Sequence, residues 1–500
     1  MLRTSNYTIY VDLPGNSEEM LLVHGYTGAY DKVSRRVATY MRSLERRRPP
    51  KPLYGDWSPE AEVEGQVPLP SEGTLQVLKR RGYLTEMSPE SEAEFFTAVT
   101  DRLHQRKILG MPSYIVMPTY NCNLRCSYCF QDHMRTDQRF GHLLRTMRPE
   151  MVDRIFAGLP KIEALHGIEG DGPRARRIGF FGGEPLLEAS RPTVQYIMDK
   201  ALALGTAAFW AVTNGTELHA YEALLSPEKL SQLQITIDGP PQEHDRRRIY
   251  ADGSGSYERI ARNISMALDH GVYVSIRLNV DRNNVQTLPE LAEEFVARGW
   301  DSQPRFSVYT APIRAENENT DAKSTFNTWE LDQAVAVLHE QHAQMTVIGR
   351  PDSSIKQQAR QIFGASGASM PTFRESFCSA HTRMYIFDAF ADIYACWDRT
   401  GDPTVRIGRL DEDGSVTLNT TVNHLWRSRT VASNPVCRNC RYALHCGGGC
   451  AVLALGKTGE YHSNFCDGFA SRFRSSVAEA YLEHVRGEEL TVTSGRVCDQ

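Results

Sequence analysis

The stretch that decides the fold is residues 114–130, Tyr-Ile-Val-Met-Pro-Thr-Tyr-Asn-Cys-Asn-Leu-Arg-Cys-Ser-Tyr-Cys-Phe. A short apolar strand is followed by Cys122, Cys126 and Cys129 in the spacing CxxxCxxC. This spacing arises by chance roughly 0.005 times in a chain of this composition. Three thiolates on one loop can hold three irons of a [4Fe–4S] cluster and leave the fourth iron open to a substrate. A zinc site with His133 as fourth ligand is the alternative.

Short β-rich runs alternate with helical stretches after this loop. The predicted strands are 114–117, 177–181, 209–212, 233–237, 272–280 and 305–308. The predicted helices lie near 149–165, 190–204, 217–230, 256–270 and 287–298. This alternation predicts an α/β fold with a parallel sheet and right-handed crossovers, an open or closed β/α barrel. In such a sheet the ligand lies at the C-terminal ends of the strands.

Polar motifs follow three of the predicted strands at those ends. Gly182-Gly183-Glu184-Pro185 follows the second strand, and Thr213-Asn214-Gly-Thr follows the third. The fourth carries Thr236-Ile-Asp-Gly-Pro, with an arginine cluster a few residues further on. The first two motifs are also good turn sequences when taken alone. Their common position at strand ends favours a binding site.

The cysteine loop closed by Phe130, together with the Gly-Gly-Glu-Pro motif, resembles the radical SAM superfamily. The fourth-strand motif is similar to the branch that includes anaerobic sulfatase-maturing enzymes. The resemblance implies a partial (β/α)6 barrel and a [4Fe–4S] cluster on the three cysteines. It also implies that bound S-adenosylmethionine is reductively cleaved to a 5′-deoxyadenosyl radical, which abstracts hydrogen from the substrate.

The resemblance also implies roles for the residues at the strand ends. The amino group of the methionine moiety would be held by Gly182, Gly183, Glu184 and Pro185. Thr213 and Asn214 would lie beside the adenosine, and Thr236 would face the ribose or the methionine. Either Arg247 or Arg248 would pair with the carboxylate, a bidentate task that suits a guanidinium.

A second cysteine cluster lies near the C-terminus, in the spacing CxxCxxxxxCxxxC. With the cysteines around it, it resembles the SPASM domain, which carries two auxiliary [4Fe–4S] clusters. The resemblance assigns one cluster to Cys437, Cys440, Cys446 and Cys466. The other would be held by Cys378, Cys396 and Cys450. A pair of zinc sites is the alternative.

The second auxiliary set departs from the family pattern. The family usually has a glycine five positions before the second cysteine, where this chain has Ala391, and no cysteine lies within 379–395. The missing fourth ligand would be Cys498, His381 or Asp398, or the site would be open to substrate. Asp398 also resembles the acid that some related enzymes use as a proton acceptor.

The first 105 residues precede these motifs. Strands over 6–12 and 20–24 and helices over about 31–45, 72–81 and 89–106 are compatible with a winged-helix unit or a plain structural extension. The predicted domains are 1–105, winged-helix-like and leader-binding; 112–315, the barrel; 316–375, a bridging region; 376–486, the SPASM domain; and 487–500, a tail.

Composition narrows the functional classes. The net charge of −5 argues against nucleic-acid binding, and the chain shows neither a signal peptide nor an apolar membrane span. We therefore expect a cytoplasmic protein, in which 11 cysteines serve metal or catalytic work. The resemblance implies a maturase that cross-links or similarly modifies a ribosomally made precursor peptide, with flavodoxin or ferredoxin as electron donor. The alternatives are a sulfatase-type formylglycine maturase and a non-catalytic iron–sulfur or zinc scaffold.

Overall fold

The computed structural model describes residues 1–45, 67–170, 172–205, 208–317, 319–350, 354–364 and 371–487. The chain divides into two compact units. One unit, here called the barrel unit, is Ile108–Pro351 with Arg383–Arg427. The other, the terminal unit, is Met1–Lys107 with Asp352–Thr382 and Ser428–Gln500. Cys498 lies outside the described residues.

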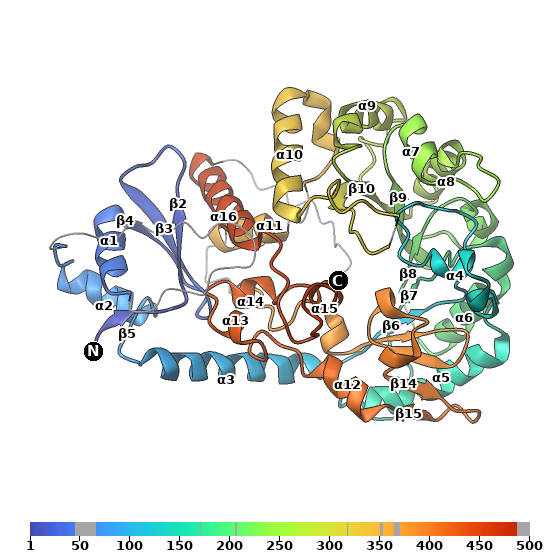
Figure 1. Ribbon diagram of the computed structural model, residues 1–500, viewed down its shortest axis with the longest axis horizontal. Coiled ribbons are helices and arrows are strands. Elements are labelled where there is room, and N and C mark those ends of the chain that lie inside the picture. The colour runs from blue at the N-terminus through green and yellow to red at the C-terminus, as the bar shows by residue number, and fades with distance from the viewer. Residues whose placement is uncertain are drawn as a thin grey trace. The chain divides into compact units, whose positions relative to one another are not determined.

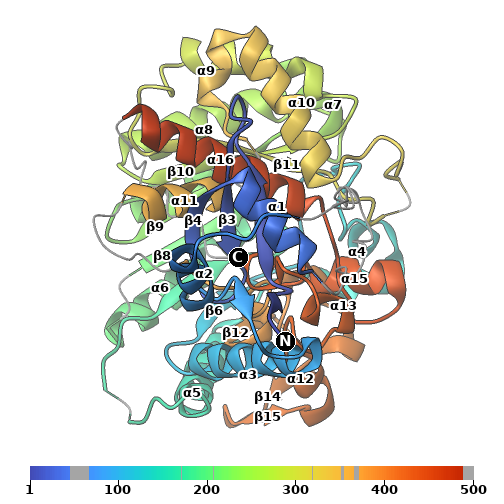
Figure 2. The same cartoon turned by 90° about the vertical axis from the view of Figure 1, so that its left-hand side faces the viewer.

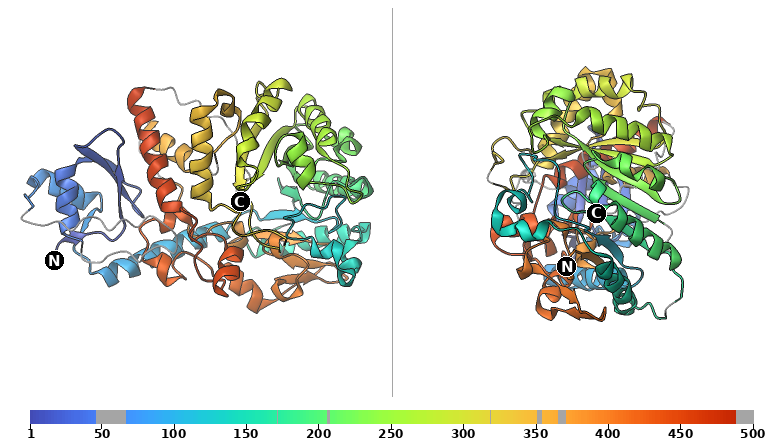
Figure 3. Two further views of the ribbon diagram at one scale, coloured as in Figure 1. Left: turned by 45° about the horizontal axis from the view of Figure 1, so that its top comes forward. Right: turned by 90° about the vertical axis from the view of Figure 1, so that its right-hand side faces the viewer.

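The barrel unit is built on six parallel strands (Figure 1). They are β6 (Ser113–Val116), β7 (Arg177–Phe180), β8 (Ala208–Thr213), β9 (Leu230–Ile237), β10 (Tyr273–Val280) and β11 (Phe306–Pro312). Their order in the sheet is their order in the chain, so right-handed crossovers place the connecting helices on one face. Figure 3 shows these helices outside the curved sheet. The predicted α/β class with a central parallel sheet is confirmed.

The connecting helices bury the outer face of the sheet. They are α5 (Pro149–Ala164), α6 (Arg191–Ala203), α8 (Tyr257–Asp269) and α9 (Leu288–Ala297). Val274, Ile276 and Leu278 of β10 are fully buried, as expected for a parallel strand covered on both faces. The helix predicted over 217–230 is wrong: a short 3₁₀ helix, Leu218–Leu224, occupies only its first half. Pro227 follows, and a residue before proline avoids helical geometry.

The sheet continues beyond β6 with strands from late in the chain. β12 (Met384–Phe387) pairs with β6 in parallel. Antiparallel partners follow in β13 (Asp392–Tyr394), β14 (Gly408–Leu410) and β15 (Val416–Leu418). The segment that carries Cys396 therefore belongs to the barrel unit.

The turn between β12 and β13 contains an unusual backbone conformation. Ala391 has φ of 68° and is the only residue other than glycine with positive φ in the described chain. Asp388 stabilises the turn, because its Oδ1 accepts hydrogen bonds from the backbone N–H groups of Phe390 (2.8 Å) and Asp392 (3.0 Å). Ala391, which stands where the family pattern has glycine, is therefore a residue with a Cβ in a left-handed backbone conformation.

We expect Ala391→Gly to be less destabilising than Ala389→Gly by about 1 kcal/mol, because only position 391 relieves left-handed strain. Both alanines are buried, so both changes remove a buried methyl group and add flexibility to the unfolded chain. Chemical denaturation of the two variants gives the difference. Equal free energies of unfolding would show that the strain at Ala391 is negligible.

The terminal unit contains a three-stranded antiparallel sheet in the order β2–β3–β4. Its elements are β1 (Arg3–Thr4), β2 (Thr8–Asp12), β3 (Glu19–His24), β4 (Tyr30–Ser34), α1 (Arg35–Ser43), α2 (Glu72–Arg80), β5 (Leu84–Thr85) and α3 (Pro89–Ile108). The helix predicted over about 31–45 begins later than predicted, at Arg35. Residues 30–34 form a strand, and the side chain of Ser34 accepts a hydrogen bond from the backbone of Val37 and starts α1 there.

The N-terminal sheet shares its core with C-terminal helices of the same unit. Ile9 and Val11 of β2 pack in one cluster with Phe473 and Val477 of α16 (Phe469–Arg486). Figure 2 shows α16, in red, running beside the blue strands. Tyr7 joins a second cluster with the C-terminal cysteine segment, and its hydroxyl donates to the carbonyl oxygen of Arg438 (2.6 Å). The first hundred residues thus complete a core that the C-terminal segments also need.

Among the described helices, none has the length and apolar character that crossing a membrane requires.

Candidate functional site

The predicted motifs meet at one edge of the barrel sheet. The cysteine loop follows β6, the Gly-Gly-Glu-Pro loop follows β7, and Thr213 is the last residue of β8. Thr236 is buried near the end of β9, and Asp238 follows that strand. Because these strands are parallel, their C-terminal ends share one edge.

The three thiols of the cysteine loop lie within electrostatic range of one another. Cys122 and Cys129 each raise the pKa of Cys126, although burial is the larger cause and brings it to about 12. Burial likewise raises the pKa of Cys122. Thiols whose pKa is raised in this way become thiolates when a metal centre supplies positive charge. The donor set therefore fits an iron–sulfur cluster with three protein ligands.

The two glycines of the next motif are required by contacts within the protein itself. A Cβ at Gly182 would collide with the carbonyl oxygen of Thr119, and one at Gly183 with that of Tyr120. The backbone N–H of Gly183 donates to Thr119 O (3.1 Å), and that of Glu184 donates to Asn121 O (2.7 Å). The Gly-Gly-Glu loop is thus joined directly to the start of the cysteine loop.

Glu184 is buried and receives several hydrogen bonds. Thr213 Oγ1 donates to its Oε1 (2.6 Å), and the backbone N–H groups of Asn214 (2.6 Å) and Leu186 (2.8 Å) also donate to it. Burial nevertheless raises the pKa of Glu184 to about 7. A carboxyl group in this state gains from a cationic ligand, because an ammonium would stabilise its anion.

Asn214 also reaches the cysteine loop. Its Nδ2 donates to Asn123 Oδ1 (2.9 Å) and lies 3.7 Å from Cys122 Sγ. Asn123 in turn donates to Thr216 Oγ1 (2.9 Å) and Glu217 Oε1 (3.0 Å). Sequence reasoning missed Asn123, although its place inside the cysteine motif was a usable signal.

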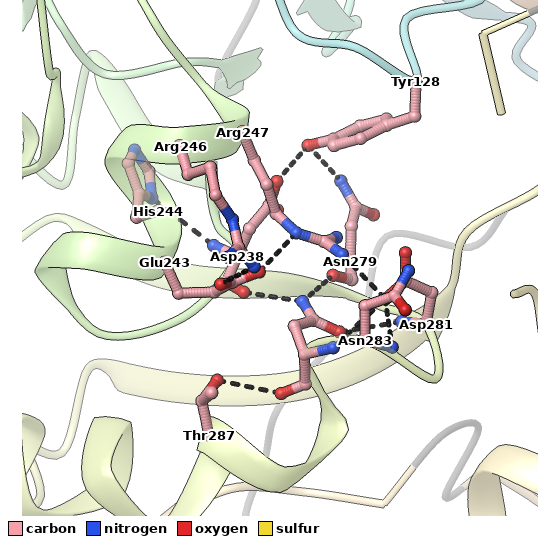
Figure 4. A network of polar contacts seen from close by, with 11 residues as sticks. Tyr128, Asp238, Glu243, His244, Arg246, Arg247, Asn279, Asp281, Asn283 and Thr287 are labelled. Atoms are coloured by element: carbon pink, nitrogen blue, oxygen red, sulfur yellow. Dashed lines mark hydrogen bonds and ion pairs between the residues drawn. The ribbon is translucent and has the colours of Figure 1, made fainter.

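A polar network joins the cysteine loop to the ends of β9 and β10 (Figure 4). The Tyr128 hydroxyl donates to Asp238 Oδ2 (2.5 Å) and accepts from Asn279 Nδ2 (3.1 Å) and Arg248 Nη1 (2.7 Å). Tyr128 carries no motif signal of its own in the sequence. Its position between two cysteines explains why it can connect the loop to the far side of the site.

The structure distinguishes the two candidate arginines. Arg247 is held in ion pairs, with Nε 2.7 Å from Glu243 and Nη2 2.7 Å from Asp281. Arg248 is buried and acts electrostatically on Cys126, and its Nε has no hydrogen-bond partner within the described chain. Of the two side chains, only that of Arg247 forms ion pairs with carboxylates among the described residues.

Asp398 lies in the barrel unit, two residues after Cys396. Burial, and then the charge of Glu316, raise the pKa of Asp398 to about 7. Next to Glu316, the side chain of Asn317 donates to the carbonyl oxygens of Cys129 (3.1 Å) and Ser127 (3.0 Å). The Glu316 segment therefore contacts the cysteine loop, a relation that the sequence did not indicate.

The structure brings together the four cysteines assigned to the first auxiliary cluster. Cys437, Cys440, Cys446 and Cys466 all lie in the terminal unit, and the pKa of Cys437 is raised by burial and then by the other three. A Cβ at Gly449 would collide with Phe465 O, so glycine is needed where two cysteine-bearing segments touch. This donor set also fits a cluster.

The second auxiliary set is divided between the two units. Cys378 and Cys450 lie in the terminal unit and Cys396 in the barrel unit, so this set stays a prediction. His381 is buried beside Arg429, whose Nη1 is 3.4 Å from His381 Nε2. Across the described residues, no three histidine, cysteine, aspartate or glutamate side chains are grouped for a single metal ion.

Arg429 was also missed. It is buried and donates to Tyr461 O (2.6 Å) and Ser463 O (2.9 Å), joining the segments around the C-terminal cysteines. Burial lowers the pKa of Arg429, and the charges of nearby cysteines, that of Cys437 most strongly, oppose this shift. No sequence motif marks this residue.

Comparisons with known proteins agree with the barrel. A model of the radical SAM superfamily matches residues 116–295. The chain is 21% identical over 406 residues to a cysteine-type anaerobic sulfatase-maturating enzyme of Clostridium novyi (strain NT), covering 74% of this chain and 99% of that one. It is 27% identical over 188 residues to GTP 3′,8-cyclase 1 of Pseudomonas aeruginosa, covering 37% and 50%.

Among solved structures, native anSMEcpe with bound AdoMet and Cp18Cys peptide is similar, with a TM-score of 0.55 and 16% identity. The match covers 76% of this chain and all of that one. This likeness shows a shared fold.

Proposed function

We propose that the protein, whose residues 116–295 match the radical SAM superfamily, is a peptide maturase that modifies a ribosomally made precursor. A [4Fe–4S] cluster on Cys122, Cys126 and Cys129, with S-adenosylmethionine, would supply the 5′-deoxyadenosyl radical typical of the superfamily. The observation that carries this proposal is the meeting of these thiols with Glu184 and Arg248 at one sheet edge.

The protein groups at this edge would hold the two charged ends of the methionine moiety. Glu184 offers a buried carboxylate for the ammonium, and Arg248 offers a guanidinium with an unused donor for the carboxylate. Pro185, Thr213 and Asn214 would shape the wall between them, and Thr236 would line the neighbouring strand end. Arg247 would keep α7 (Pro241–Arg247) in place through its ion pairs.

We expect S-adenosylmethionine to bind about tenfold more tightly at pH 8 than at pH 6. The pKa of Glu184 in the free protein is about 7, and the ammonium of the ligand requires its anion. The ionised fraction therefore rises through this window, and affinity rises with it. Anaerobic equilibrium dialysis measures the effect.

The control for this pH dependence is Glu184→Gln, which should bind weakly at both pH values. A wild-type affinity that stays constant from pH 6 to pH 8 would remove Glu184 from ammonium recognition.

The precursor peptide has a candidate docking edge in the terminal unit. Among the described strands, β4 pairs with β3 alone. The residues of β4 are half-buried or exposed, whereas four of the five residues of β2 are buried. Extended peptides bind such open edges by adding a strand. We propose that the leader segment of the precursor adds to β4.

Asp398 and the auxiliary cysteines complete the proposal. Asp398 would accept the proton released when the substrate radical is oxidised, since burial and Glu316 already adjust its pKa to about 7. The clusters held by the C-terminal cysteines would take up the electron. A flavodoxin or ferredoxin would deliver the reducing electron to the radical site.

The direct test is to incubate iron-loaded protein with reductant, S-adenosylmethionine and a short peptide encoded beside its gene. A cross-link appears by mass spectrometry as the loss of two hydrogen atoms. A non-catalytic scaffold would form neither this product nor 5′-deoxyadenosine.

A sulfatase-type maturase is the second candidate, favoured by the 99% coverage of the Clostridium novyi relative. A peptide carrying a sulfatase modification site separates the two readings. Formylglycine formation on that peptide, without modification of the gene neighbour's product, would favour the second candidate.

A further inference from the structure

Arg135 lies in the segment that follows the radical-site cysteines. It belongs to the short helix α4 (His133–Thr136), and its side chain is only 2% exposed. Its Nη2 donates to Cys129 Sγ at 3.0 Å. The guanidinium also lies within electrostatic range of Cys122, so it faces two of the three cluster ligands.

The other nitrogens of this guanidinium are unused. Nε and Nη1 of Arg135 are buried and have no hydrogen-bond partner anywhere in the described chain. The nearest carboxylate, that of Asp132, is 4.0 Å from Nη2. Burying donors without acceptors is costly, so their acceptors belong to something that the polypeptide alone does not supply.

Arg125, a second arginine of the same loop, has contacts that are typical of a purely structural role. Arg125 Nη1 donates to two backbone carbonyl oxygens, Cys122 O (2.8 Å) and Leu124 O (2.9 Å), and forms no hydrogen bond to a thiol of the described residues. Arg139, further along, is 84% exposed and pairs with Asp137. Arg135 alone of these three combines burial, a sulfur contact and unused donors.

We propose that Arg135 is a positioning residue of the radical-site cluster, which places a fixed positive charge and N–H donors against its sulfur atoms and makes the cluster easier to reduce. Reduction adds a negative charge to the cluster, and a buried cation stabilises that charge strongly because solvent screening is weak there. Hydrogen bonds to cluster sulfurs act in the same direction. This proposal rests on the radical SAM domain and not on the identity of the substrate.

The test is a redox titration followed by electron paramagnetic resonance, on the cluster signal that changes when S-adenosylmethionine is added. Arg135→Gln should retain the three cysteine ligands and their iron but lower the equilibrium constant for reduction about tenfold. For a one-electron couple this moves the midpoint 59 mV more negative. Arg139→Gln is the matched control and should leave the midpoint unchanged.

Two further variants test whether the charge of Arg135 causes the shift in midpoint potential. Arg135→Lys keeps the charge and should recover most of the midpoint lost in the Gln variant. Asp132→Asn removes the nearby negative charge and should move the midpoint in the positive direction, a result available even if Arg135→Gln fails to fold. An unchanged midpoint in iron-loaded Arg135→Gln, or equal shifts in the Gln and Lys variants, overturns the proposal. No peptide is needed, so these outcomes do not depend on the proposed maturase activity.

Discussion

Replacing Cys122, Cys126 and Cys129 together by alanine will remove about four of about twelve irons per chain and abolish formation of 5′-deoxyadenosine. The three thiols lie in electrostatic range of one another, and Cys122 also lies in range of Glu184. At this edge the Gly-Gly-Glu loop is hydrogen-bonded to the cysteine loop. Of the other described cysteines, only Cys396 belongs to the barrel unit.

The matched control replaces Cys440, Cys446 and Cys466, which lie in the terminal unit. That variant should also lose about four irons but keep cleaving S-adenosylmethionine when no peptide is present. Iron assay and chromatography of the reduced reaction give both readouts. Production of 5′-deoxyadenosine by the first triple variant would refute the assignment of the radical site.

Lys32→Pro should weaken precursor binding by at least about tenfold and leave uncoupled cleavage of S-adenosylmethionine unchanged. In the β3–β4 ladder, His24 N donates to Ala29 O and Arg35 N donates to Glu18 O. Bonded pairs alternate along an antiparallel ladder, so the N–H of Lys32 points away from β3. Proline at this position removes an outward donor and blocks an added strand, but it breaks no bond to β3.

Lys32→Ala is the control, because it also loses the ion pair between Lys32 Nζ and Glu19 (2.9 Å) but keeps the backbone donor. Fluorescence anisotropy with a labelled precursor compares the two variants. Equal affinities would exclude docking on β4. Deleting residues 1–105 is a weaker test, because Tyr7, Ile9 and Val11 share cores with the C-terminal cysteine segment and α16.

Local patterns in the sequence were sufficient for the barrel and its motifs. The apolar run before Cys122 forms β6, and the helix predicted over 149–165 is α5 almost residue for residue. Periodicity and spacing are short-range properties, and these elements obey them. The errors at 30–34 and 217–230 arose where a cap or a proline changed the element within a few residues.

Contacts between distant segments could not be read from these patterns. The pairing of β12 with β6 joins residues about 270 positions apart. The local sequence Met384–Phe387 does not indicate that this strand pairs in parallel with β6. The buried guanidiniums of Arg135 and Arg429 are marked by no motif, because their partners are thiols and carbonyls that only folding brings near.

The adjacent residues Arg247 and Arg248 best separate what the sequence determines from what the tertiary structure determines. The sequence by itself determined that an arginine would stand beyond β9 near the site, and it left Arg247 and Arg248 equivalent. The tertiary structure separated them, because Arg247 is the last residue of α7 and lies one turn from Glu243, which it pairs with. Arg248 follows the helix with φ of −122° and ψ of 71°, so its side chain leaves the helical direction and reaches Tyr128 instead.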